Sequence, residues 1–315
     1  MRVGPPDAAP RSFAGDRRLG EAWTPRQQRK NDALFLLANT SVAVLSRTPR
    51  ATVRPLGTLL GAAVWMLWRG GRQAVARGLG AAEVPDVGAL SVFCGLDTVL
   101  MDTLLLLGKE PARTPGWKLD DESRATLTAA LAEGRGVVFA TGHLGAWERM
   151  ASGLVEEGFS ITTVARESYD ARYHAIYERL RGARGVRVLY RGAPGFSTAI
   201  VRTLRTGGIV GFPMDIAGRG VRTTPVPFLG ALRQLPVGPA ILAKRTGAAL
   251  VVGTPTGPAH LGLSVKISRV RTDVDMSPVE VTVELARTLE ARIRTLPTEW
   301  PWMLVAREVV PTLES

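Results

Sequence analysis

The sequence contains very little cysteine and few aromatic residues. Cys94 is the only cysteine among 315 residues, so the chain forms no intrachain disulfide and has no cysteine cluster that would bind zinc. Aromatic residues make up 6% of the chain, too few for the platforms on which nucleic-acid bases stack. The basic residues are scattered rather than striped. We therefore predict that the protein binds no nucleic acid.

Apolar runs long enough to span a membrane without a charge are also missing. Pro55–Trp68 is uncharged but shorter than the roughly 20 residues that a spanning helix needs. The longer stretch Val84–Gly108 contains Asp86, Asp97 and Asp102. Two interpretations remain open for these segments: helices buried in the protein core, or helices that lie in the headgroup layer of a membrane.

Acidic residues are under-represented relative to basic ones. The chain has 40 Lys and Arg against 28 Asp and Glu, a formal net charge of +12, and 45% of its residues are hydrophobic. This balance favours polyanionic partners, such as an anionic membrane surface or an acidic protein.

The composition divides the chain into three parts. Residues 1–32 are polar, rich in Pro, Arg and Gly, and without the apolar core of a secretory signal, so we expect a disordered tail. Residues 33–118 contain the apolar stretches and form the predicted helical, membrane-associated region. Residues 119–315 alternate between helical patterns and short apolar runs, which is typical of an α/β catalytic domain.

The alternation in the third part predicts a mostly parallel central sheet with helices on both faces. The expected strands are Gly136–Thr141, Ser160–Ala165, Val186–Leu189, Ile209–Pro213, Ala249–Thr254 and, as an edge strand, Leu263–Val270. The expected helices are Asp121–Glu133, Trp147–Glu157, Asp170–Arg181, Phe196–Arg205, Val237–Arg245 and Val279–Leu296.

The turn after the first of these strands is the place where chemistry is expected. Ligands of such sheets bind beyond the carboxyl ends of the strands. Here Gly142 and Gly145 allow a sharp turn and leave backbone N–H groups open, with His143 between them and Glu148 in the first turn of the next helix. We expect the Glu148 carboxylate to reach the imidazole and hold its tautomer, leaving the other ring nitrogen as a general base.

The chain has few histidines, so few residues are candidates for a histidine general base. Of three histidines, His143 alone lies at a predicted strand end among glycines, whereas His174 falls in a helix and His260 in a loop. No further ligands accompany His143 and Glu148 at the spacing of a metal site, so we predict no metal and no cofactor.

The motif His143-x4-Glu148 resembles the signature of the lysophospholipid, or glycerolipid, acyltransferase superfamily. The longer string GHLGAWE is similar to the G-H-x-G-N-W-E of the late acyltransferases of lipid A biosynthesis, with Ala146 in place of Asn. Further blocks that resemble this branch in order are Val164–Arg166, Leu180–Arg191, Leu204–Asp215, Val226–Gly230, Gly238–Gly247 and Pro297–Met303. The usual His-Arg after the last block is missing.

The resemblance implies a glycerolipid acyltransferase-like fold and a membrane-associated enzyme on the cytoplasmic face of the inner membrane. The donor would be a fatty acyl thioester on acyl carrier protein or coenzyme A. The acceptor would be a hydroxyl or amine of a lipid or glycolipid, deprotonated by His143 with the help of Glu148.

The resemblance also implies roles for other residues. Arg166 and Arg184 would bind phosphate or stabilise developing negative charge, and Gly145 and Asp215 would contribute to substrate binding. Trp300 and Trp302 are expected to be packing residues. Two alternatives stay open: a glycerophospholipid or aminolipid acyltransferase of the same superfamily, and a basic membrane-binding module without catalysis.

Overall fold

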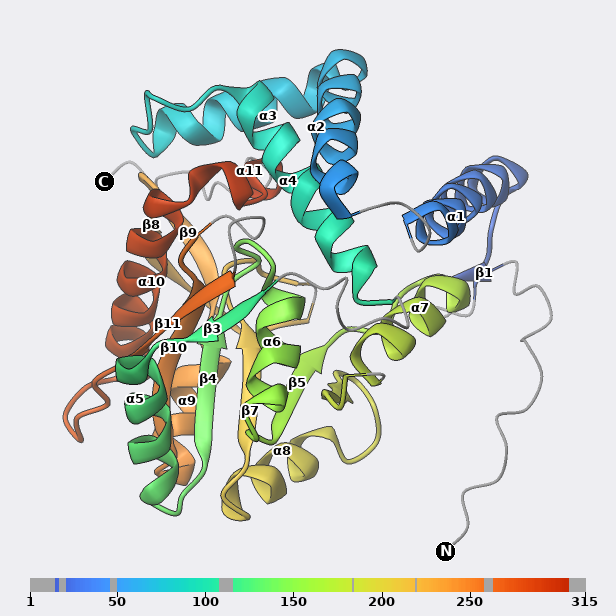
Figure 1. Ribbon diagram of the computed structural model, residues 1–315. Helices are drawn as coiled ribbons and strands as arrows, with labels where there is room; N and C mark the ends of the chain where they lie inside the picture. The colour runs from blue at the N-terminus through green and yellow to red at the C-terminus, as the bar shows by residue number, and fades with distance from the viewer. Residues whose placement is uncertain are drawn as a thin grey trace, which may run out of the picture.

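The computed structural model describes residues 15–16, 21–45, 50–107, 116–182, 184–218, 220–257 and 263–305. Its centre is a seven-stranded sheet in the order β3-β11-β10-β4-β7-β5-β6 (Figure 1). The strands are β3 (Trp117–Leu119), β4 (Val137–Thr141), β5 (Ile161–Ala165), β6 (Arg187–Tyr190), β7 (Ile209–Pro213), β10 (Ala249–Pro255) and β11 (Leu263–Arg269).

The strands of the sheet are parallel except at one place, where β10 and β11 run antiparallel. The mostly parallel α/β sheet is therefore confirmed. The expected edge position of Leu263–Val270 is wrong, because β3 pairs with β11 on its outer side. A strand of three residues is too short to show an alternating pattern in the sequence.

Helices cover both faces of the sheet. They are α5 (Asp121–Ala132), α6 (Trp147–Glu156), α7 (Ala171–Gly182), α8 (Phe196–Arg205), α9 (Gly238–Thr246) and α10 (Pro278–Thr295). Successive residues of β4 point to opposite faces: Val138 and Ala140 belong to one buried cluster, Val137 and Phe139 to the other. Burial on both faces explains why these strands are continuous apolar runs.

Smaller elements complete the fold. A hairpin of β8 (Thr223–Phe228) and β9 (Ala231–Pro236) packs beside α10 and was not predicted as a pair of strands. Strands β1 (Gly15–Asp16) and β2 (Glu21–Ala22) form a two-residue ladder. The chain then ends its described part with a 3-10 turn at Pro297–Glu299 and α11 (Trp302–Val305).

Four helices precede the sheet: α1 (Pro25–Leu45), α2 (Arg50–Leu67), α3 (Arg69–Ala81) and α4 (Ala89–Leu105). Figure 1 shows α2, α3 and α4 gathered at the carboxyl-end edge of the parallel strands. Glycines permit the close packing there, since a Cβ on Gly61 would lie 2.6 Å from the Cα of Cys94, and one on Gly95 would lie 2.3 Å from the carbonyl oxygen of Thr298. The sheet and the helical region thus meet at one edge of the sheet.

The first helix begins earlier than expected. Residues 25–32, which the sequence analysis placed in the polar tail, form the first turns of α1. Contacts with the α7 region hold this segment: Tyr169 donates to Asn31 (3.3 Å), and Arg172 binds Asp32 (2.7 Å). Among the described residues, no helix combines the length and the apolar character that crossing a bilayer requires.

Candidate active site

The site lies where β4 and β7 end side by side. Thr141 closes β4, His143 stands in the turn that follows, and α6 begins at Trp147. The neighbouring strand β7 pairs Pro213 with Thr141, which brings Asp215 beside the same turn. Two loops that are distant in the sequence therefore meet at one point of the edge.

Asp215 holds His143 through two hydrogen bonds. Its Oδ1 lies 2.8 Å from the ring Nδ1, and its Oδ2 accepts a hydrogen bond from the backbone N–H of His143 at 2.7 Å. The indole N–H of Trp300 donates to the same Oδ2 at 2.9 Å. Because an ionised carboxylate only accepts hydrogen bonds, Nδ1 must carry the ring proton, which leaves Nε2 as the acceptor.

The expected contact between Glu148 and the His143 ring is wrong. Glu148 is buried and accepts hydrogen bonds from Arg181, whose Nε lies 3.2 Å and 3.1 Å from the two carboxylate oxygens. Arg181 Nη2 also contacts Glu148. The motif His143-x4-Glu148 lies in one segment of the sequence. It could not show that the Asp215 carboxylate, which follows β7, contacts the ring instead of Glu148. The position that the sequence analysis gave to Glu148 belongs to Asp215.

The charges around His143 favour its protonated form. Burial lowers the pKa of His143, but the Asp215 carboxylate and, more weakly, Glu148 outweigh it, so the pKa lies above its usual value. Burial has the opposite effect on the carboxyl group of Asp215 and raises its pKa. The contacts with His143 and Trp300 outweigh burial and hold the pKa of Asp215 below its usual value. Asp215 is therefore ionised near neutral pH. The side chain of His143 remains 31% exposed, so a substrate can reach it.

The two glycines of the turn serve the packing of the site. A Cβ on Gly142 would lie 3.0 Å from Oδ2 of Asp215, so glycine here lets the carboxylate approach. Gly145 has a φ of +54° and donates its N–H to the carbonyl of Glu299 at 2.9 Å. That N–H is therefore engaged with protein, contrary to the expectation that it stays open for substrate.

The predicted arginines occupy different positions. Arg184 donates to the carbonyl of Leu106 at the end of α4 (3.2 Å from Nη2), which fastens that helix to the sheet domain. Arg166 is exposed and follows β5, at the edge that holds His143. Burial and, after it, the charge of Arg166 lower the pKa of Arg191, which follows β6.

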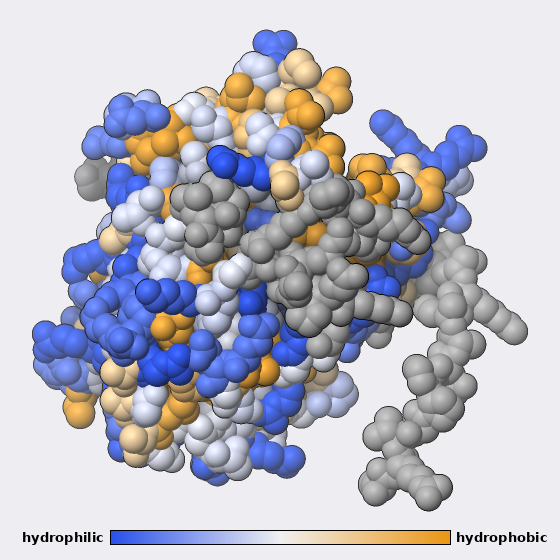
Figure 2. All heavy atoms as spheres, viewed as in Figure 1, coloured by the Kyte–Doolittle hydropathy of each residue, from blue (hydrophilic) through white to orange (hydrophobic). Residues whose placement is uncertain are grey.

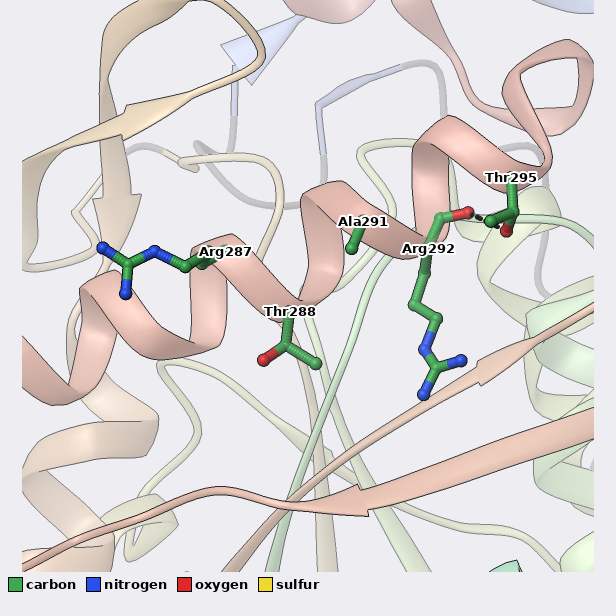
Figure 3. Close-up of a pocket in the computed structure, with 5 residues that line it drawn as sticks. All are labelled: Arg287, Thr288, Ala291, Arg292 and Thr295. Atoms are coloured by element: carbon green, nitrogen blue, oxygen red, sulfur yellow. Dashed lines mark hydrogen bonds between the residues drawn. The ribbon is translucent and has the colours of Figure 1, made fainter.

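Helix α10 carries a depression that none of the residues above lines. Figure 3 shows its lining residues, Arg287, Thr288, Ala291, Arg292 and Thr295. In the part of the chain that the structure describes, no three His, Cys, Asp or Glu residues are grouped as metal ligands would be.

Trp300 and Arg181 are the residues whose contacts at the candidate site sequence reasoning missed. Trp300 was expected to pack, and it does pack, fully buried against Phe228 and Trp302. Its indole N–H nevertheless contacts Asp215. Arg181 belongs to the Leu180–Arg191 block that resembled the lipid A branch, but nothing in its spacing indicates Glu148 as its partner.

Comparisons with known proteins show the family to which the chain belongs. A profile of bacterial lipid A biosynthesis acyltransferases matches residues 118–305, well over half of the chain. A phosphatidylinositol mannoside acyltransferase of Mycolicibacterium smegmatis is 31% identical over 194 residues, covering 59% of this chain and 61% of the relative. One from Mycobacterium tuberculosis strain H37Rv is 36% identical over 133 residues, 40% of each chain. The matches thus span between two and three fifths of these relatives' lengths.

Proposed function

Because the chain belongs to the bacterial lipid A biosynthesis acyltransferase family, we propose that it transfers a fatty acyl group from an acyl thioester to a hydroxyl of a glycolipid. The donor is acyl-coenzyme A or an acylated carrier protein. The observation that supports the proposal most directly is the chain of contacts from Trp300 through Asp215 to His143 at the carboxyl-end edge of the sheet. The same arrangement orients a general base in other acyl-transfer enzymes.

The proposed mechanism begins with neutral His143, whose Nδ1–H donates to Asp215. Nε2 accepts the proton of the acceptor hydroxyl while the hydroxyl oxygen attacks the thioester carbonyl. The tetrahedral intermediate then collapses: the C–S bond breaks, and the thiolate takes the proton back from the imidazolium. The products are an ester and a free thiol. The negative charge of Asp215 stabilises the imidazolium between these two steps.

Glu148 acts through charge and through Arg181 in this proposal. Its carboxylate raises the pKa of His143 without touching the ring. Arg181, which belongs to α7, fixes the position of that carboxylate. Glu148 is thus a positioning residue and an electrostatic partner rather than the residue that sets the tautomer.

The acceptor that we propose is a mannosylated phosphatidylinositol or a glycolipid of similar build. The support comes from the two relatives, whose names state that acceptor. Acyl transfer to a glycerophospholipid or an aminolipid would use the same base. The acceptor class is therefore decided by assay rather than by the geometry of His143.

The experiment is a transfer assay with purified protein, one of two radiolabelled donors (palmitoyl-coenzyme A or palmitoylated carrier protein) and three acceptors: phosphatidylinositol mannoside, lysophosphatidic acid and an aminolipid. We expect labelled ester on the mannoside, lost in His143→Ala. A protein that folds, as judged by circular dichroism, and labels none of the acceptors from either thioester donor refutes the proposal.

We further infer that the protein binds the cytoplasmic leaflet without crossing it. Figure 2 shows hydrophobic residues exposed over the N-terminal helices. On α1, Leu36 is 67% exposed; on α2, Leu59 is 67% and Leu67 87% exposed. The net charge of +12 would add attraction to anionic lipid.

Vesicle flotation tests this inference. Leu59→Ser with Leu67→Ser should weaken partitioning about a hundredfold, since two leucines removed from lipid cost about 3 kcal/mol. Val279→Ser is the matched control, because Val279 is 44% exposed at the start of α10, on the opposite edge of the sheet. Equal binding of all three proteins contradicts the inference.

A further inference from the structure

Two aromatic side chains lie beside the His143–Glu148 segment and remain partly open to solvent. Trp147 begins α6, and its ring meets the His143 ring in a T-shaped arrangement with the ring centres 5.3 Å apart. Tyr177 of α7 is 45% exposed, and the guanidinium of Arg181, which binds Glu148, stands over its ring at 5.4 Å. Burial and, after it, the charge of Glu148 raise the pKa of the Tyr177 hydroxyl. The two rings therefore adjoin the candidate site from two different helices.

Neither ring uses its polar group within the protein. In the part of the chain that the structure describes, the indole N–H of Trp147 and the hydroxyl of Tyr177 have no hydrogen-bond partner. The fully buried indole of Trp300, in contrast, donates to Asp215 at 2.9 Å. Tyr and Trp at binding surfaces combine an apolar ring with a polar group that bonds to the ligand. Trp147 and Tyr177 thus offer the same site apolar ring surface and two hydrogen-bonding groups.

A sugar ring matches these two side chains better than an acyl chain does. The C–H groups of a sugar form an apolar face that packs on an aromatic ring, and its hydroxyls bond to the polar groups around it. A saturated acyl chain has no partner for an N–H or an O–H. An acceptor hydroxyl that bonds to Nε2 of His143 lies about 2.8 Å from it. The sugar that carries this hydroxyl is then within contact of Trp147, whose ring centre is 5.3 Å from that of the imidazole.

We propose that Trp147 and Tyr177 bind the sugar ring of the acceptor and turn the hydroxyl that receives the acyl group toward His143. The sugar packs on the indole, and its other hydroxyls bond to the indole N–H and to the Tyr177 hydroxyl. The inference rests on the acyl transfer to a glycolipid proposed above. It adds the residues that distinguish a sugar from the headgroup of a glycerophospholipid.

Steady-state kinetics test the two positions. Tyr177→Leu and Trp147→Leu should each raise the KM for phosphatidylinositol mannoside tenfold or more and leave the KM for palmitoyl-coenzyme A within threefold. Trp147→Phe keeps a ring beside His143 and removes the N–H, so it should raise the same KM by a smaller factor. Tyr173→Leu is the matched control, because this tyrosine lies one turn earlier on α7 and its ring packs on Phe35 of α1. A raised KM for palmitoyl-coenzyme A alone means that the rings contact the donor, and overturns the inference.

A binding measurement separates this inference from the proposed function. Saturation-transfer NMR with methyl mannoside needs no acyl donor. The ring protons of the mannoside should receive saturation from the wild type and from Tyr173→Leu, and at least threefold less from Tyr177→Leu at unchanged circular dichroism. If the mannoside binds in this way but no acyl transfer occurs, the site stands and the proposed function fails. Unchanged KM values, together with mannoside signals that are equal in all the proteins or absent from the wild type, overturn the inference.

Discussion

Replacing Asp215 with asparagine should invert the tautomer of His143. The Oδ2 position accepts hydrogen bonds from the backbone N–H of His143 (2.7 Å) and the indole N–H of Trp300 (2.9 Å). The amide oxygen of the introduced asparagine must take that position, because an amide NH2 cannot accept hydrogen bonds. The NH2 group then faces Nδ1 and donates to it. Nδ1 loses its proton, the proton moves to Nε2, and the base is lost.

The magnitude follows from the alternative arrangement. Turning the amide round restores the productive tautomer but points its NH2 at two buried N–H donors. Each donor left without an acceptor costs about 1–3 kcal/mol, so the productive form lies about 2–6 kcal/mol higher. We expect kcat to fall between about 30-fold and 10⁴-fold, at a tenfold change for each 1.36 kcal/mol.

The assay is the pH dependence of kcat/KM for acyl transfer. In the wild type the base must be neutral, so activity should rise with pH through a pKa above the usual value for histidine. Asparagine removes the carboxylate that raises this pKa. The rising part of the kcat/KM profile should therefore move to lower pH in the variant, and the maximal kcat/KM should fall. If the rising part of the profile does not shift in the variant and its kcat stays within threefold of wild type, the role given to Asp215 is refuted.

Three further substitutions test the surroundings of the His143–Asp215 pair. Trp300→Phe keeps the packing but removes the N–H donated to Asp215, so kcat should fall about tenfold while circular dichroism stays unchanged. Arg181→Met leaves the buried Glu148 charge unpaired and should lower the free energy of unfolding by about 3–5 kcal/mol in urea titrations, whereas similar stability would show that the pair contributes little. Gly142→Ala should place a methyl 3.0 Å from Oδ2 of Asp215 and reduce kcat tenfold or more; wild-type kcat would mean that the carboxylate adjusts freely.

The architecture could be predicted because its signals are local. Strands buried on both faces appear as short apolar runs, and the helices between them have clear periods, so the expected strands and helices of the α/β domain fall close to their observed bounds. Elements whose stability depends on distant partners left no such signal. Strand β3 exists through its pairing with β11, and α3 packs through Gly78 on Trp302 from the end of the chain.

The position of His143 in the fold could be predicted from the sequence, but its hydrogen-bond partners could not. A histidine between two glycines after a buried strand was expected at the carboxyl-end edge of the sheet, and His143 lies there. Which carboxylate would meet the ring depended on the strand order, since β7 rather than α6 brings its acid to Nδ1. Asp215 was expected near substrate from the family resemblance. The pairing of β4 with β7 places it in contact with His143.

The charge balance of the site explains why Glu148 is held close to His143 without touching it. With a neutral ring, Asp215, Glu148 and Arg181 sum to one negative charge. When His143 takes the proton of the acceptor in the proposed mechanism, the charges of the four groups sum to zero, so the transfer removes an uncompensated charge from largely buried side chains. A second carboxylate bonded directly to the ring would compete for the nitrogen that the substrate needs. Pairing Glu148 with Arg181 keeps its field at the ring while leaving Nε2 free to act as the base.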